Sequence, residues 1–455
     1  MKSIEEHREK VKEIADLAFA NAVNNMDLSS MVNSYPSSWD KDLYKKFIEK
    51  VHEGFKIAQN LLIEEIQYYQ TLLKNTIQEL KQFRRDRDKK SEEITKSNIA
   101  IIKQRLSTFH HIADGIAWQL IGGEIHIARR FHIGEQESKN LDSSNIKHAI
   151  SVVNQINKNP LDFALISDLT NFVQIGDVIA KSNGRIGIME LKEGSVNEQI
   201  SDFFEQMKKE DKEITEDVLK AEFDDKTIKQ VKRMQRQKMR ADRATEVINN
   251  DEGTEPVSGG KITVSTPTIP TEGYHQEILA LKDKLDTKIW AYTVIEKCLH
   301  LGMYRDKGIL MAGAAIEATI KRETENYIMV DWLSITDNLS QPIFAKPFDP
   351  EFILDILTGK IKIILGLNLD RLIEVFNELG IETRWLSTKE TAKIKKQETR
   401  KGMIVVNNRG ITMKVPHLKG SEMILGGGII SKILYDNINP SNMALTLLTL
   451  YPETK

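Results

Sequence analysis

The sequence predicts a multidomain protein with a helical N-terminal region, an α/β core and a C-terminal α+β domain. The chain has 455 residues, more than one hydrophobic core usually holds. Apolar residues recur at three-to-four spacing in the first part, and short apolar runs bounded by turn residues follow. A Gly- and Pro-rich stretch, 249–273, then reads as a linker. We therefore place the domains at 1–136, 137–215, 216–273 and 274–455.

Composition excludes several classes of protein. Lys and Arg number 64 against 66 Asp and Glu, a net charge of −2, so a globally basic nucleic-acid binder is excluded and such contacts need a local patch. The single cysteine, Cys298, permits neither an internal disulfide nor a Cys-rich zinc site. The N-terminus lacks the features of a secretory signal, and no apolar run approaches about 18 residues. We expect a cytoplasmic protein without a membrane span.

Residues 1–136 are predicted to be helical. Apolar positions in 55–83 follow helical spacing, and Ser37 or Ser38 is a candidate cap for a helix beginning just after it. A further helix is predicted over 98–120, with Ser97 as its cap. Long helices of this kind predict a homo-oligomer formed through the helical region.

The pattern then changes to that of an α/β core. A helix that ends before Pro160 is followed by three short strands and an amphipathic helix. The predicted strands and final helix are Phe163–Asp168, Phe172–Ala180, Arg185–Lys192 and Asn197–Lys209. Asn183-Gly184 between two apolar runs is a strong hairpin signal. The predicted order is therefore helix, strand, strand, strand, helix.

Three charged residues on this hairpin carry the functional prediction. Side chains alternate along a strand, so Glu190 and Lys192 point the same way, and Asp177 on the paired strand converges with them if the register is right. Such a cluster in apolar sequence is costly for stability alone. It suits metal-assisted phosphodiester hydrolysis, with Asp177 and Glu190 holding Mg²⁺ or Mn²⁺ and Lys192 orienting the attacking water. The alternative is an ordinary ion-pair cluster at a strand edge.

This stretch, over residues 143–210, resembles the PD-(D/E)xK nuclease superfamily, which has the restriction-endonuclease-like fold. The resemblance places Asp177 as the first acid, Glu190 as the second and Lys192 as the lysine, and it implies an α/β core with a mixed sheet. Gly176 stands where the motif has proline.

Many members of the superfamily add an acid on the first helix and a glutamine or lysine on the helix after the triplet. Asp114 and Glu124 are candidates for the first, and Gln199 and Gln206 for the second. The sequence does not choose between the members of either pair.

The segment 226–243 is a strongly basic predicted helix directly after this core. Its position suits contacts to the phosphates of DNA, and RNA is not excluded. The predicted contact residues are Lys232, Arg233, Arg236, Lys238 and Arg240. The alternative is pairing with the acidic stretch 210–225 of the same chain.

We therefore expect a Mg²⁺-dependent DNA endonuclease, of the kind found in bacterial genome defence against phage. Two alternatives remain open. The first alternative is a non-enzymatic oligomeric scaffold or sensor. The second is a metal-independent ribonuclease, because Arg105 and His110 match the Arg-x4-His pattern of HEPN ribonucleases.

Overall fold

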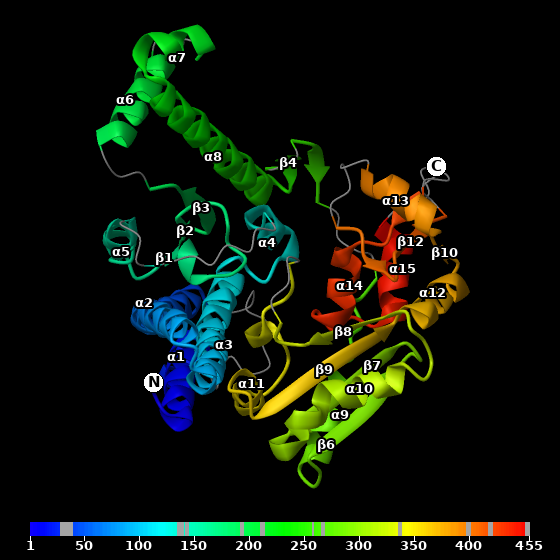
Figure 1. The fold of residues 1–455 in the computed structure, drawn as a ribbon. Coiled ribbons are helices and arrows are strands. Elements are labelled where there is room, and N and C mark those ends of the chain that lie inside the picture. The colour runs from blue at the N-terminus through cyan, green and yellow to red at the C-terminus, as the bar shows by residue number, and fades with distance from the viewer. Residues whose placement is uncertain are drawn as a thin grey trace. The chain divides into compact units, whose positions relative to one another are not determined.

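The computed structural model forms two compact units, Met1–Val264 and Ser265–Lys455, here called the N-terminal and C-terminal units (Figure 1). It describes residues 1–27, 40–133, 141, 145–191, 195–209, 214–256, 259–264, 269–334, 339–396, 402–416 and 422–450. The division falls within the predicted segment 216–273. The helical region, the predicted core and the basic helix share one unit.

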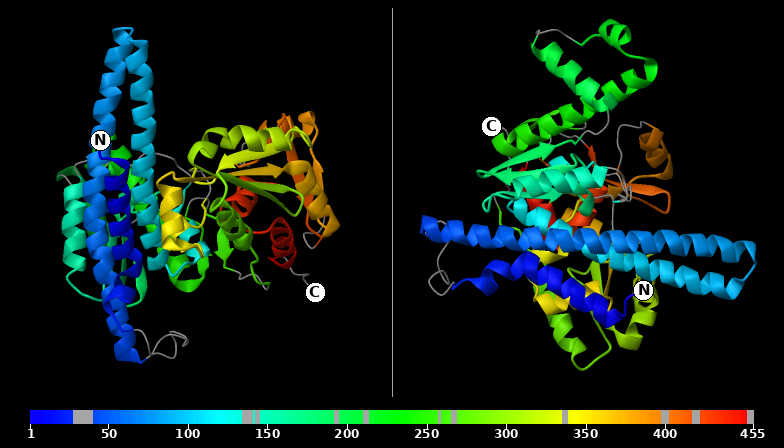
Figure 2. Two further views of the ribbon diagram at one scale, coloured as in Figure 1. Left: turned by 90° about the horizontal axis from the view of Figure 1, so that it is seen from below. Right: turned by 90° about the vertical axis from the view of Figure 1, so that its left-hand side faces the viewer.

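Three long helices form the base of the N-terminal unit: α1 (Ile4–Asn25), α2 (Lys41–Arg85) and α3 (Lys89–Leu120). They lie side by side (Figure 2) and enclose an apolar core that includes Ile14, Leu62 and Phe109. The cap of α3 differs from the prediction. Asp88 accepts a hydrogen bond from the Ser91 N–H at 3.1 Å, so the helix begins at Lys89 and Ser97 lies within it. Ser37 and Ser38 lie outside the described residues.

A three-stranded sheet follows, in the order β1-β2-β3. Its elements and the helices before it are α4 (Ile125–Phe131), α5 (Asn145–Ile156), β1 (Phe163–Ile166), the short 3-10 helix η2 (Ser167–Leu169), β2 (Val178–Ser182) and β3 (Arg185–Met189). Asn183 and Gly184 form the predicted hairpin turn, with φ angles of 50° and 77° that this turn type requires. Strands β1 and β3 are shorter than predicted, and Phe172–Asp177 is a loop rather than the start of β2.

The mixed sheet expected for a restriction-endonuclease-like core is not found in the described part of the chain, where every strand pair is antiparallel. A parallel strand needs a crossover that returns the chain to the same sheet. Here the chain leaves β3 for three helices, α6 (Ser195–Lys209), α7 (Glu216–Glu222) and α8 (Asp225–Asn250). It then forms a separate hairpin of β4 (Glu252–Thr254) and β5 (Lys261–Thr263).

Helix α8 links two parts of the N-terminal unit. Its first half packs with α6 and α7 in a small apolar core that includes Ile200, Leu219 and Val231. Its last turns contact β3, where the Asn249 amide donates to the Ile186 carbonyl at 3.4 Å. The helix after the predicted triplet therefore packs on other helices.

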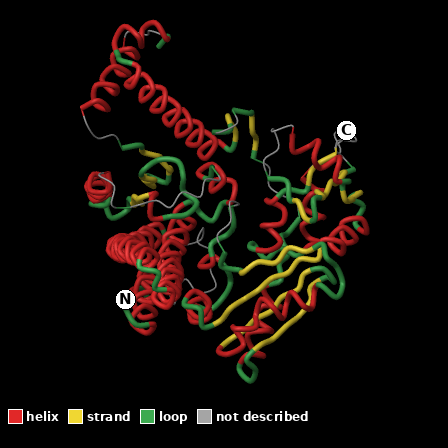
Figure 3. The backbone as a smooth tube through the Cα atoms, viewed as in Figure 1, coloured by secondary structure: helices red, strands yellow, loops and turns green. Residues whose placement is uncertain are grey.

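The C-terminal unit is built on a four-stranded antiparallel sheet of order β6-β7-β9-β8 (Figure 3). A second, smaller sheet joins β10, β12, β11 and β13. The elements are α9 (His275–Leu285), β6 (Trp290–Ile295), β7 (Leu299–Arg305), η3 (Asp306–Met311), α10 (Ala312–Ile320), β8 (Tyr327–Asp331), η4 (Ile343–Ala345), α11 (Pro350–Leu357), β9 (Ile361–Asn368), α12 (Leu369–Glu378), β10 (Glu382–Trp385), α13 (Thr388–Lys396), β11 (Val405–Val406), β12 (Arg409–Lys414), β13 (Glu422–Ile424), α14 (Gly427–Leu434) and α15 (Pro440–Leu450). This mixture of helices and antiparallel strands agrees with the predicted α+β character.

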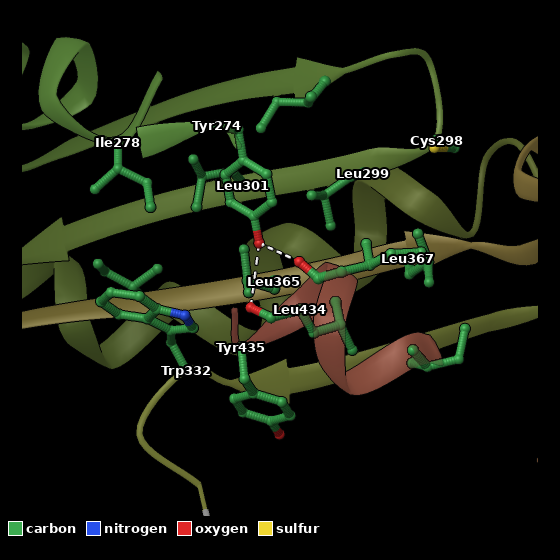
Figure 4. Close-up of a cluster of buried hydrophobic side chains, with 14 of the residues drawn as sticks. Tyr274, Ile278, Cys298, Leu299, Leu301, Trp332, Leu365, Leu367, Leu434 and Tyr435 are labelled. Atoms are coloured by element: carbon green, nitrogen blue, oxygen red, sulfur yellow. Dashed lines mark hydrogen bonds between the residues drawn. The ribbon is translucent and has the colours of Figure 1, made fainter. Parts of the chain in front are cut away.

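The main core of the C-terminal unit lies on one face of the four-stranded sheet. Tyr274 is fully buried there, and its hydroxyl donates to the carbonyls of Ile433 and Leu434 at 2.7 and 3.1 Å (Figure 4). Helix α10 covers the other face, where Gly302 and Gly366 leave room for its Ile316 and Ile320 side chains. The central strands β7 and β9 are therefore buried on both faces. Across the described residues of both units, no helix combines the length and apolar character needed to cross a membrane.

Candidate active site

The two predicted acids lie at the same end of the β2–β3 hairpin. Asp177 directly precedes β2 and Glu190 directly follows β3, and both are half-buried. The Leu191 N–H donates to Asp177 Oδ2 at 2.6 Å, and the Gly176 N–H donates to Glu190 Oε1 at 3.2 Å. Each carboxylate thus reaches the backbone of the opposite segment. We call this arrangement the crossed carboxylate pair, Asp177 and Glu190.

Local backbone geometry explains why the chain folds this way. Gly176 has a φ of +81°, and a Cβ there would lie 2.4 Å from the Ile188 side chain. Glycine therefore fits where the family motif has proline. The Asp177 N–H donates to the Met189 carbonyl at 2.8 Å, and the Ser167 N–H donates to the Asp177 carbonyl at 2.9 Å. The acid is tied by its backbone to both neighbouring segments, so its side chain starts from a fixed position.

The chemistry of the pair fits a hard divalent cation. A carboxylate offers about four lone-pair sites, so it can accept hydrogen bonds and also bind a cation. Mg²⁺ is usually held by one or two protein carboxylates together with water and phosphate oxygens. In the described ranges, no group of three or more His, Cys, Asp or Glu side chains is placed to hold a metal ion. A cation held by these two acids would take its remaining ligands from water or phosphate.

The remaining predicted members of the site are not assembled around this pair in the described chain. Lys192 lies outside the described residues. Asp114 is buried and accepts from the Asn171 backbone and side-chain amides, both at 2.7 Å, so it anchors the loop before Gly176. Glu124 lies at the start of α4, 3.4 Å from the His126 ring.

The neighbouring helices also bear on the family motif. Helix α5, directly before the sheet, has no Asp or Glu in its sequence. Gln199 and Gln206 lie on α6, which packs with α7 and α8. Of the two candidate acids, Asp114 lies on α3 and Glu124 at the start of α4, so neither lies on the helix directly before the sheet.

The basic helix is α8, and four of its five predicted contact residues share one face. At 3.6 residues per turn, Lys232, Arg233, Arg236 and Arg240 fall opposite the buried Val231. We call these four residues the cationic face. The first three are exposed and Arg240 is half-buried. Lys232 lies 3.4 Å from Glu216, so part of the predicted pairing with the acidic stretch is present.

Lys238 occupies a different place from the cationic face. It falls on the Val231 side of α8 and lines a groove of about 660 Å³ between α6 and α8. The groove is also lined by Phe204, Met207, Met239 and Arg243. Sequence reasoning missed this groove, because it depends on how α6 folds back along α8. The amphipathic pattern of 197–209 was the one available signal.

Arg105 and His110 make separate structural contacts on α3. Arg105 is buried, and its guanidinium donates to the Lys2 carbonyl at 2.6 Å, which ties α1 to α3. His110 Nδ1 donates to the Leu169 carbonyl at 2.7 Å, which ties α3 to η2. The two side chains therefore bind different neighbours.

Comparisons with known proteins bear on the resemblance to the PD-(D/E)xK superfamily. No family model, no curated protein and no solved structure matches the chain. The candidate site accordingly stands on this chain's own residues, hydrogen bonds and element order.

Proposed function

We propose that the N-terminal unit is a nuclease that uses Mg²⁺ or Mn²⁺ to cleave phosphodiester bonds of DNA. Asp177 and Glu190 are its metal ligands, and Lys192 is its third catalytic residue. The observation that carries the proposal is the crossed carboxylate pair at the open end of the hairpin. The element order helix, strand, strand, strand, helix around that pair supports it.

The residues of the site have distinct tasks in this proposal. Asp177 and Glu190 supply hard oxygen ligands, and the backbone N–H groups of Leu191 and Gly176 hold those carboxylates in place. A bound divalent cation supplies a water of lowered pKa and screens the charge of the phosphate. Lys192 holds the attacking water or donates to the charged phosphate oxygens.

The cationic face of α8 supplies affinity for the nucleic acid. Its four positive side chains lie on the same unit as the acid pair, and Arg contacts phosphate with a planar fork of donors. Such contacts position the backbone of the nucleic acid without reading its sequence. The affinity is therefore expected to fall steeply with salt.

The test is degradation of plasmid and linear DNA by the full chain in Mg²⁺ or Mn²⁺. Asp177→Asn, Glu190→Gln and Lys192→Ala are each expected to lower the cleavage rate by at least about a hundredfold, because each removes a group that acts on the reacting phosphate. Asp286→Asn is the matched control. Asp286 begins another acid-x-lysine triplet, Asp286-Thr287-Lys288, on an exposed turn after α9, and the rate should not change.

Two results would overturn the proposal. One is cleavage that survives both Asp177→Asn and Lys192→Ala. The other is loss of RNA in the presence of EDTA that His110→Ala abolishes, which would favour the HEPN alternative.

A further inference from the structure

Exposed apolar side chains gather at one edge of the sheet in the C-terminal unit. Trp290 and Val294 on β6 are 55% and 40% exposed, and Leu310 and Met311 in η3 are 86% and 62% exposed. Two observations place η3 near the start of β6. Ile309 and Tyr292 pack against the same small core, and Gly308 lies directly against the Ile289 carbonyl. We call Trp290, Val294, Leu310 and Met311 the edge patch.

Strand β6 also presents unpaired backbone. It lies at the end of the order β6-β7-β9-β8 and pairs with β7 only (Figure 1). The Arg305 N–H donates to the Ile289 carbonyl, so the backbone groups of Ile289 point toward β7. Because backbone direction alternates along a strand, the N–H and C=O groups of Trp290, Tyr292 and Val294 point away from β7. Within the described ranges, no hydrogen bond is formed by the N–H and C=O groups of these three residues on that side.

This edge lacks the features that usually protect a sheet edge. Natural edge strands carry Lys, Pro or a bulge, or another element covers them. The edge of β1 in the N-terminal unit is covered, because the Gln59 side chain bonds to the Ala164 carbonyl and the Ile166 N–H. The sequence of β6, Trp-Ala-Tyr-Thr-Val-Ile, has neither a charge nor a proline. The contrast indicates that β6 is covered by a partner.

We propose that β6 joins two copies of this chain into a dimer with twofold symmetry. Antiparallel pairing of a strand with itself places one residue on the twofold axis and makes the interface self-complementary. With Tyr292 on the axis, the free backbone groups of Trp290, Tyr292 and Val294 all pair with those of the second copy. Trp290 then lies opposite Val294 of the second copy. Pairs of an aromatic and a β-branched side chain are favourable across strands. The register thus joins the free backbone and the exposed side chains in one interface.

The size of the edge patch fits a stable dimer. Its four exposed fractions equal nearly two and a half fully exposed side chains, on the order of 400 Å² of apolar surface in each copy. A standard interface buries about 800 Å² per partner, of which slightly more than half is apolar. An extended peptide from another protein would cover the strand, but it would not need the self-complementary register.

The first test measures the oligomeric state of the full chain by light scattering and sedimentation. The wild type is expected to be a dimer. In the double variant Trp290→Lys and Val294→Lys, like charges lie directly opposite each other, and the dimer Kd should rise at least about tenfold. Leu445→Lys is the matched control, because Leu445 on α15 is 40% exposed, the same fraction as Val294. Thermal unfolding of each variant checks that the fold is kept.

The second test crosslinks the proposed twofold axis. In a hydrogen-bonded antiparallel pair the Cα atoms lie about 5.5 Å apart, within the range of a disulfide. Tyr292→Cys treated with oxidised glutathione should form a covalent dimer. Val294→Cys should not, because it faces Trp290, and the single native cysteine is buried. A monomeric wild type at about 100 µM, or equal crosslinking of the two variants, would overturn the proposal.

Discussion

Buried histidines in the N-terminal unit couple its stability to pH. His7 packs edge-on against the rings of Tyr69 and Phe109, and His52 packs against Phe55 and Phe163. Burial, with nearby Arg and Lys side chains, lowers the pKa of each from 6.5 to about 4. Both rings are therefore neutral in the folded protein at neutral pH.

The lowered pKa values predict acid destabilisation between about pH 6.5 and 4. Below 6.5 the unfolded chain takes up protons that the folded chain does not, so the stability present at neutral pH is lost as the pH falls. Each ring contributes on the order of 2 kcal/mol to this loss. Urea unfolding at pH 7 and pH 5 measures it, and His7→Gln should flatten the dependence. An unchanged pH dependence in His7→Gln would contradict this assignment.

The sequence was enough to predict which residues form the candidate site, but it was not enough to predict the geometry of their contacts. The alternation of side chains and the Asn183-Gly184 turn were enough to place Asp177 and Glu190 on adjacent segments. The crossed hydrogen bonds were not predictable, because they depend on the positive φ of Gly176. Phe172–Asp177 has the apolar pattern of a strand, but it forms a loop because buried Asp114 binds Asn171. That contact joins residues far apart in the sequence.

At the scale of elements, one side chain of α2 completes the edge of the small sheet. Gln59 is 1% exposed; its amide donates to the Ala164 carbonyl at 3.1 Å, and its oxygen accepts from the Ile166 N–H at 2.9 Å. The side-chain oxygen of Asn157 accepts a hydrogen bond from the Ala164 N–H at 2.8 Å. Buried backbone groups without partners are costly, so these bonds hold β1 on the helices.

Gln59→Leu is therefore expected to weaken the sheet that carries the candidate site. It leaves the buried Ile166 N–H unpaired, at a cost of about 1–3 kcal/mol, while the Ala164 carbonyl keeps its bond from the Asn157 amide at 3.5 Å. Hydrogen exchange at the Ile166 amide should become faster, which mass spectrometry of the corresponding peptide detects. Gln78→Leu, at an exposed position of the same helix, is the control. Equal exchange in the two variants would show that Gln59 does not hold the strand.

The position of each cation on α8 predicts which ones bind nucleic acid. Arg233→Ala and Arg236→Ala remove exposed charges of the cationic face, and each should weaken DNA binding and lower the salt slope by about one. Lys238→Ala removes an equal charge from the groove side and should change the slope little. Fluorescence anisotropy at several salt concentrations measures the slopes. A larger effect of Lys238→Ala would mean that the groove binds the strand.

At the scale of the whole molecule, the chain consists of two units with separate cores. One cluster of buried side chains, from Tyr274 to Leu447, lies entirely within the C-terminal unit. The division between Val264 and Ser265 falls inside the Gly- and Pro-rich stretch 249–273. The packing of the predicted core on the long helices was not predictable, because it rests on long-range contacts such as those of Gln59.

Separate cores predict that 1–264 and 265–455 fold independently when each is expressed alone. Each piece should show a cooperative thermal transition, and the sum of their circular dichroism spectra should match that of the full chain. If either piece unfolds alone, its core depends on the other unit.

The measurement that tests the central claim most directly is Mn²⁺ binding to the full chain, followed by electron paramagnetic resonance. The account predicts one site per chain, with affinity reduced at least about tenfold in both Asp177→Asn and Glu190→Gln and unchanged in Asp286→Asn. Binding that is the same in wild type and in both site variants would contradict the claim that the crossed carboxylate pair holds a catalytic cation.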